Sequence, residues 1–65
     1  MQYFNSSAIH AANYNPATGN LTIWFTSSGQ GYDYPNVPQH IWNGLLTASS
    51  AGAFFNQYIR DQYAA

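Results

Sequence analysis

The stretch LTIWFT at residues 21–26 is the strongest structural signal in the sequence. Apolar side chains alternate there with two threonines and a tryptophan, and a period of two is typical of a β-strand with one buried face. We therefore expect Leu21, Ile23 and Phe25 to face a core and Trp24 to point away from it.

Turn signals on both sides of this strand predict its neighbours. Residues 15–20 read NPATGN, in which proline presets φ and glycine tolerates a positive φ, so we expect a hairpin loop after a first strand at residues 8–14. A second turn signal at residues 27–29 precedes a third strand, Gly31–Tyr34, whose two tyrosines share one face. This part of the chain is thus predicted to form a three-stranded antiparallel β-meander.

The spacing of apolar residues then becomes helical. Pro35 and Pro38 end the extended region, and a proline suits the first turn of a helix because its missing N–H is not needed there. The residues that recur at helical spacing, or widen the apolar stripe, are Val37, Ile41, Trp42, Leu45, Leu46 and Ala48.

Two serines separate this helix from a second one. Either Ser49 or Ser50 is suited to cap the second helix. Its apolar face is predicted to consist of Gly52, Phe55, Ile59 and Tyr63. The order βββαα predicts an α+β fold in which both helices pack on one face of the meander, as a single domain over residues 1–65.

The composition is rich in rings and poor in charge. The 65 residues include four phenylalanines, six tyrosines and two tryptophans, which must supply most of the core because there is no cysteine. Arg60 is the only Lys or Arg, and Asp33 and Asp61 are the only acidic residues. A net charge near zero favours self-association, and a single arginine argues against binding to a nucleic-acid phosphate backbone.

The groups that catalysis needs are few and scattered. His10, His40, Asp33 and Asp61 fall on different predicted elements, and no spacing among them is typical of a metal site. We therefore expect no enzyme activity, no cofactor and no metal. With neither a signal peptide at the start nor an apolar run of membrane length, the expected location is the cytoplasm.

The ordered set of motifs resembles a known family. Its elements are Ser6-Ser7 with Ile9, Tyr14, Leu21-Ile23-Phe25, Tyr32-Asp33-Tyr34, Val37-Pro38, Leu45-Leu46, Ser50 with Gly52, Phe55-Asn56, Ile59-Arg60 and Tyr63. This series is similar to the KTSC family, a small domain named after the C-terminal domain of some lysyl-tRNA synthetases. The resemblance spans nearly the whole chain and implies a domain that also occurs alone in bacterial and phage proteins. It also implies a role in RNA binding, but family members tend to carry more Lys and Arg than this chain does.

Five residues are candidates for binding. Trp24 is expected on the face away from the helices, where it either contacts a partner or packs locally under the N-terminal segment. Tyr32 and Tyr34 either form a stacking platform on an open sheet face or belong to the core beneath the helices. Asn56 and Arg60, four residues apart on the second helix, either bind a ligand together or serve the fold, with Arg60 paired to an aspartate.

Three hypotheses for function follow. The first is a non-enzymatic protein-interaction adaptor that docks through aromatic surface, beginning with Trp24. The second, from the family resemblance, is an RNA-binding accessory domain. The third is a self-associating structural unit of bacterial or phage origin. We expect a protein partner or self-association rather than nucleic acid, and neither a membrane nor a small-molecule cofactor.

Overall fold

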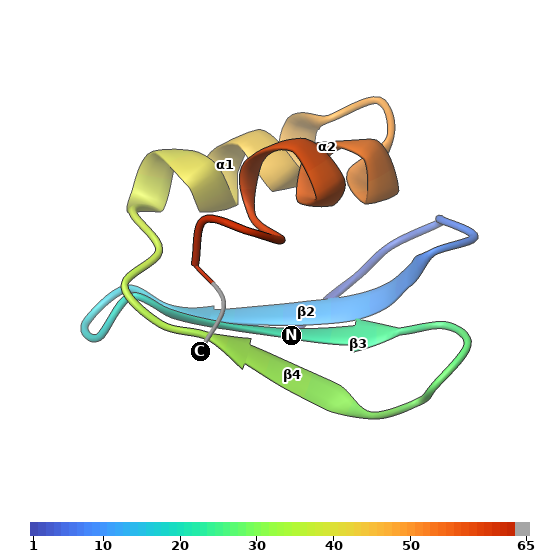
Figure 1. The fold of residues 1–65 in the computed structure, drawn as a ribbon, viewed down its shortest axis with the longest axis horizontal. Helices are drawn as coiled ribbons and strands as arrows, with labels where there is room; N and C mark the ends of the chain where they lie inside the picture. Colours follow the sequence, from blue (N-terminus) through green and yellow to red (C-terminus); the bar gives the residue numbers. More distant parts are fainter. Residues whose placement is uncertain (64–65) are drawn as a thin grey trace.

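The computed structural model describes residues 1–63, which form a four-stranded antiparallel sheet and two helices (Figure 1). The elements are β1 (Gln2–Tyr3), β2 (Ile9–Asn15), β3 (Asn20–Phe25), β4 (Gly31–Tyr34), α1 (Gln39–Thr47) and α2 (Ala51–Tyr58). The strands lie in the order β1-β2-β3-β4, so each pairs with its neighbour in the sequence. The predicted α+β fold is confirmed, with β1 as an addition at the edge of the predicted meander.

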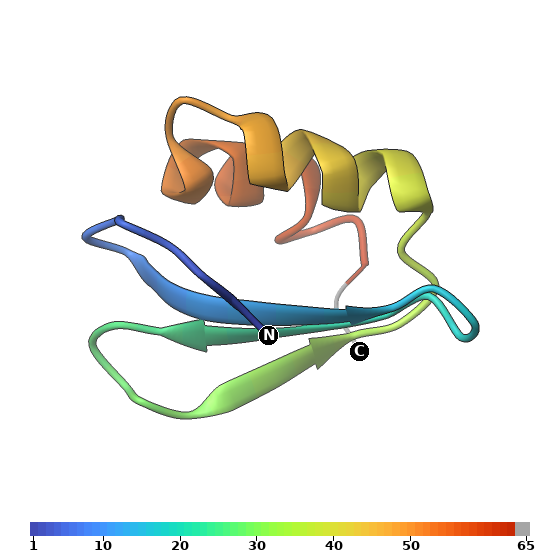
Figure 2. The ribbon, with the colours of Figure 1, turned by 180° about the vertical axis from the view of Figure 1, so that it is seen from behind.

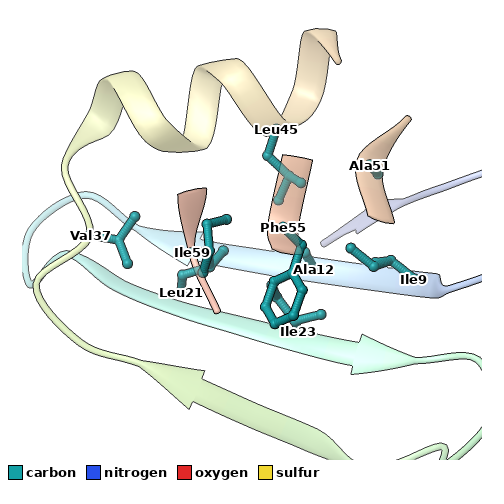
Figure 3. Close-up of a cluster of buried hydrophobic side chains, with 9 residues drawn as sticks. All are labelled: Ile9, Ala12, Leu21, Ile23, Val37, Leu45, Ala51, Phe55 and Ile59. Atoms are coloured by element: carbon teal, nitrogen blue, oxygen red, sulfur yellow. The ribbon is translucent and has the colours of Figure 1, made fainter. Parts of the chain in front are cut away.

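Both helices lie on the same face of the sheet, as Figures 1 and 2 show from opposite sides. The buried side chains between the two layers are Ile9, Ala12, Leu21, Ile23, Val37, Leu45, Ala51, Phe55 and Ile59 (Figure 3). The prediction that Leu21 and Ile23 face the core is therefore confirmed. Phe25 packs against the same cluster but is only half-buried, because it lies at the end of β3.

Tyr14 fixes the point at which the chain leaves the sheet for α1. Its hydroxyl donates a hydrogen bond of 2.6 Å to the carbonyl oxygen of Val37, and its ring stacks on Trp42 with 5.5 Å between ring centroids. The Val37 N–H in turn donates to the Gly19 carbonyl oxygen at 2.8 Å. Gly19 has a φ of 77°, which a side chain would strain, so glycine is the residue that suits this end of the hairpin loop. Both backbone polar groups of Val37 are thus bonded to the first hairpin.

Small residues and a cap let the helices approach the rest of the fold. The Ser50 hydroxyl accepts a hydrogen bond from the Ala53 N–H, which confirms the predicted cap of α2. A Cβ atom on Gly52 would lie 3.0 Å from that of Ala8, and one on Gly44 would lie 2.5 Å from the Phe54 ring. Glycine at these positions therefore allows α2 to approach the loop before β2 and the α1 helix closely.

Two details of the predicted helices are wrong. The α2 helix ends at Tyr58 rather than continuing to Tyr63, because the chain turns toward the sheet and buries Ile59 (Figure 1). The Phe55 carbonyl oxygen accepts hydrogen bonds from the N–H groups of both Ile59 and Arg60, which closes this turn. On α1, Leu46 is 40% exposed and lies outside the apolar stripe assigned to it.

One further property of the helices concerns membranes. Within residues 1–63, neither helix has the length and apolar character required to cross a bilayer.

Replacing Tyr14 by phenylalanine should destabilise the protein. The Tyr14→Phe variant keeps the ring that stacks on Trp42 but leaves the Val37 carbonyl oxygen without its donor. We expect the free energy of unfolding to fall by about 1 kcal/mol, measured by urea denaturation followed by circular dichroism. The matched control is Tyr58→Phe, whose ring is exposed. Equal losses in the two variants would contradict the role of the Tyr14 hydroxyl.

Candidate functional site

A groove opens between the end of α2 and the edge strand β4. It has a volume of about 340 Å³, and its lining residues are Phe25, Ser27, Ser28, Tyr32, Tyr34, Phe55 and Arg60. We refer to it as the aromatic groove. A hollow of this volume lies within the range of roughly 300–1,000 Å³ that small-ligand and side-chain pockets occupy.

The strand register explains why both tyrosines of β4 line this groove. Tyr34 pairs with Leu21 and Tyr32 pairs with Ile23, so these tyrosines share the sheet face of the buried leucine and isoleucine. The β4 strand, however, is the edge of the sheet and lies farther from the helices than its neighbours (Figures 1 and 2). The tyrosines are therefore only partly covered, and 43% of Tyr32 remains exposed.

Ring packing forms the floor of the aromatic groove. The Phe55 ring meets Phe25 and Tyr34 edge to face, with centroid distances of 5.1 Å and 5.5 Å. Phe25 also contacts Tyr32 at 5.6 Å. Edge-to-face contacts of this kind are favourable and define the orientation of each ring. The floor is thus built from the same Phe55 side chain that belongs to the core.

Of the described residues, Arg60 is the only charged one that lines the aromatic groove. Burial raises the pKa of Tyr34 above its ordinary value, the neighbouring Tyr32 raises it further, and the positive charge of Arg60 opposes both effects. No acidic side chain pairs with Arg60 within residues 1–63. Asp33, one of the two acids, instead accepts a 2.6 Å hydrogen bond from the Thr22 hydroxyl on the opposite face of the sheet.

That opposite face is the second candidate surface, and Figures 1 and 2 show that the described chain places no helix over it. A cross-strand row formed by Tyr3, Ala11, Trp24 and Gly31 runs over all four strands of residues 1–63. We call this side of the sheet the outer face. Tyr3 is 65% exposed and meets the ring of His10 edge to face.

Trp24 points away from the helices, as the alternation in β3 predicted. Its side chain is half-buried because the indole lies against Gly31 on the next strand. A Cβ atom at Gly31 would lie only 2.8 Å from the indole Nε1, so a larger residue there would push the ring away. Trp24 therefore presents only part of its ring to solvent.

The structure groups the five predicted site residues in a way that the sequence did not indicate. Tyr32, Tyr34 and Arg60 meet in the aromatic groove, Trp24 lies on the outer face, and Asn56 is exposed on α2 outside the groove lining. Of the two alternatives for Tyr32 and Tyr34, the position beneath the helices agrees with the structure, since both lie on the helix side of the sheet and Tyr34 packs against the core. The pairing of Asn56 with Arg60 along one helix is wrong, since α2 ends before Arg60.

Several contributors to these surfaces were not predicted. Phe25 and Phe55 were assigned to the core alone, and Ser27 and Ser28 to a turn, although all four line the aromatic groove. Tyr3 was not assigned at all.

The aromatic groove has the chemistry of a binding site. Among residues 1–63, neither a histidine nor an aspartate lines it, and no group of three or more metal-ligating side chains of the histidine, cysteine or carboxylate type comes together. Rings, two serine hydroxyls and one guanidinium can receive an apolar group and an anion.

Comparison with known proteins agrees with the resemblance described from the motifs. A family model described as the KTSC domain matches residues 5–63. A protein from Tsukamurella paurometabola is 42% identical over 65 residues, which cover 100% of this chain and 96% of that protein. A protein from Stutzerimonas stutzeri is 38% identical over 58 residues, covering 89% of this chain and 80% of its own length.

Two further relatives extend this comparison. A lysine–tRNA ligase from Nostoc sp. is 39% identical over 57 residues, which cover 88% of this chain but only 10% of the ligase. The crystal structure of a KTSC domain protein from Yersinia pestis superposes with a TM-score of 0.90 at 32% identity, covering 95% of this chain and 86% of that one. The same fold thus occurs in small proteins, and a similar sequence forms a minor part of a large enzyme.

The environment of Tyr34 should be visible in an alkaline titration. Because its folded-state pKa lies above the ordinary value of 10.0, the contribution of this group to stability is complete below that value and is lost as the pH rises through the folded-state pKa. We expect the ultraviolet absorbance of tyrosinate to show a late-ionising component that is absent in Tyr34→Phe. The control Tyr58→Phe should keep it; a late component that survives in Tyr34→Phe would contradict the assignment.

Proposed function

The chain belongs to the KTSC domain family, and on that premise we propose that it is a small, non-enzymatic binding module of the cytoplasm that docks on a protein partner through its outer face. The proposed partner is a folded protein that offers a neutral, largely apolar patch. This is the adaptor role that the ring-rich sequence led us to expect.

The observation that supports this proposal is the low charge of the outer face, on which Tyr3 is 65% exposed, Trp24 is half-buried and Ala11 between them is buried. The row formed by Tyr3, Ala11, Trp24 and Gly31 carries no ionised side chain. Beside it, Asp33 already accepts a hydrogen bond from the Thr22 hydroxyl. A surface of this kind gains free energy mainly from burying apolar area, because it has few charges to desolvate. Aromatic residues that are already ordered are also the side chains that most often dominate protein interfaces.

Truncation of Trp24 should weaken partner binding. We expect Trp24→Ala to reduce affinity for the captured partner by about 30-fold, since removal of a central interface ring costs about 2 kcal/mol. The measurement is a pull-down from a bacterial lysate followed by titration of the captured protein. Tyr58→Ala, which removes an exposed ring from the helix side, is the matched control and should bind like the parent protein.

Circular dichroism must first establish that the Trp24→Ala variant is folded, and Trp24→Phe should restore part of the affinity.

Three outcomes would count against this assignment. Unchanged binding by a folded Trp24→Ala variant would contradict docking through the outer face. Equal loss in Tyr58→Ala would indicate a different surface. Sedimentation that shows the chain binding only to itself would favour the self-associating unit, which its net charge of −1 makes physically reasonable.

RNA binding is the second candidate function. The match to part of a lysine–tRNA ligase favours it, and so does the position of Arg60 beside the rings of Tyr32 and Tyr34. Against it stands the charge of the chain, because affinity for a phosphate backbone depends on several basic residues and this chain has one.

A titration in low salt separates the two functions. We expect mixed-sequence RNA oligonucleotides to leave the amide NMR spectrum of labelled protein unchanged. Low salt strengthens electrostatic contacts with RNA, but the chain has only one arginine and no lysine to make them. Spectral shifts that spread from Arg60 to both tyrosines of β4 would overturn this expectation and favour RNA.

A further inference from the structure

The free edge of β4 lies directly beside the aromatic groove. Within residues 1–63, β4 pairs only with β3, so its other edge presents backbone N–H and C=O groups to solvent. Natural sheets commonly protect such an edge by keeping it very short, or with charged side chains, lysine above all, proline or a bulge. The β4 strand, GYDY, has four residues with no lysine and no proline, and its one charged side chain, Asp33, is hydrogen-bonded to Thr22 on the outer face. This edge is therefore available to another strand.

A strand added at this edge would direct side chains into the groove. Neighbouring strands lie about 4.8 Å apart and alternate their side chains between faces. On the helix side, Tyr32 and Tyr34 line the aromatic groove, so a strand paired with β4 would lie beside that groove. Alternate residues of an added strand would thus meet the rings of the groove.

The lining of the groove defines the chemistry of the added strand. Its floor of phenylalanine and tyrosine rings suits a large apolar side chain. At its rim stands Arg60, which is exposed and has no acidic partner within the described chain. A guanidinium in this position complements a carboxylate, with which it can form two parallel hydrogen bonds. The groove therefore suits a ligand that presents an apolar side chain and a carboxylate on the same face of its strand.

We propose that the aromatic groove and the free edge of β4 together form a binding site for an extended peptide segment of a partner protein, in which a large apolar residue stands two positions away from an aspartate or glutamate, so that both side chains point to the same face. The peptide pairs with β4 through its backbone, places the apolar side chain among Phe25, Tyr32 and Phe55, and sets its carboxylate on Arg60. This site is separate from the outer face, so the two surfaces allow the module to bind two different proteins at once.

A randomised peptide library tests the proposal. The probe is a library of N-acetylated, C-amidated heptapeptides, so that each carboxylate comes from a side chain. We expect the selected peptides to combine an acidic residue with a large apolar one two positions away. Their affinity should fall by roughly tenfold in Arg60→Gln, because a charge-assisted hydrogen bond is lost. Arg60→Lys, which keeps the charge, should retain part of the affinity.

Two controls separate this site from the one on the outer face. Trp24→Ala should leave peptide affinity unchanged, and the amide hydrogens of Gly31–Tyr34 should exchange more slowly when the peptide is bound. The proposal is overturned if no heptapeptide is enriched, if enriched peptides bind the folded Arg60→Gln variant with equal affinity, or if Trp24→Ala abolishes their binding. None of these results depends on whether the outer face also has a partner.

Discussion

The contact of Phe55 with the edge of the sheet is the interaction on which the rest of the structure depends. This one side chain of α2 belongs to the core cluster and meets the rings of Phe25 and Tyr34 edge to face. The Ser50 cap starts the helix, and Gly52 lets it approach the loop before β2, so both set the position of Phe55. Because the same ring also forms the floor of the aromatic groove, folding and the shape of the candidate site have a common origin.

The lack of charge gives the remaining surface its character. A folded chain of this size buries only ~60% of the surface that its unfolded form exposes, so apolar side chains must remain at the surface. Most proteins of this length surround such residues with charges, whereas this chain has one basic and two acidic residues. Its polar side chains mainly form local hydrogen bonds, such as those of Ser6 and Asn15 to nearby backbone N–H groups. The exposed rings are therefore the principal means by which this surface can recognise another molecule.

Local patterns predicted most of the fold, and the failures have a physical cause. The β3 strand and the Ser50 cap were predictable because alternation and capping are read from neighbouring residues. By contrast, β1 is only two residues long and has no period of its own; its pairing with β2 places it. The end of α2 was missed because Ile59 keeps the helical spacing while a turn buries it. The aromatic groove could not be predicted for the same reason, because the turn after α2 decides where Arg60 lies.

A core that is complete within one small domain is compatible with the different settings in which similar sequences occur. In the ligase from Nostoc sp. the similar segment makes up 10% of the protein, whereas in the protein from Tsukamurella paurometabola it makes up 96%. The core side chains, Phe55 above all, can remain the same in both settings because they do not depend on what surrounds the domain. Trp24 and Arg60 lie outside that core cluster, so either residue can change without opening the core. The residues on either face can therefore change while the core of the fold remains as it is.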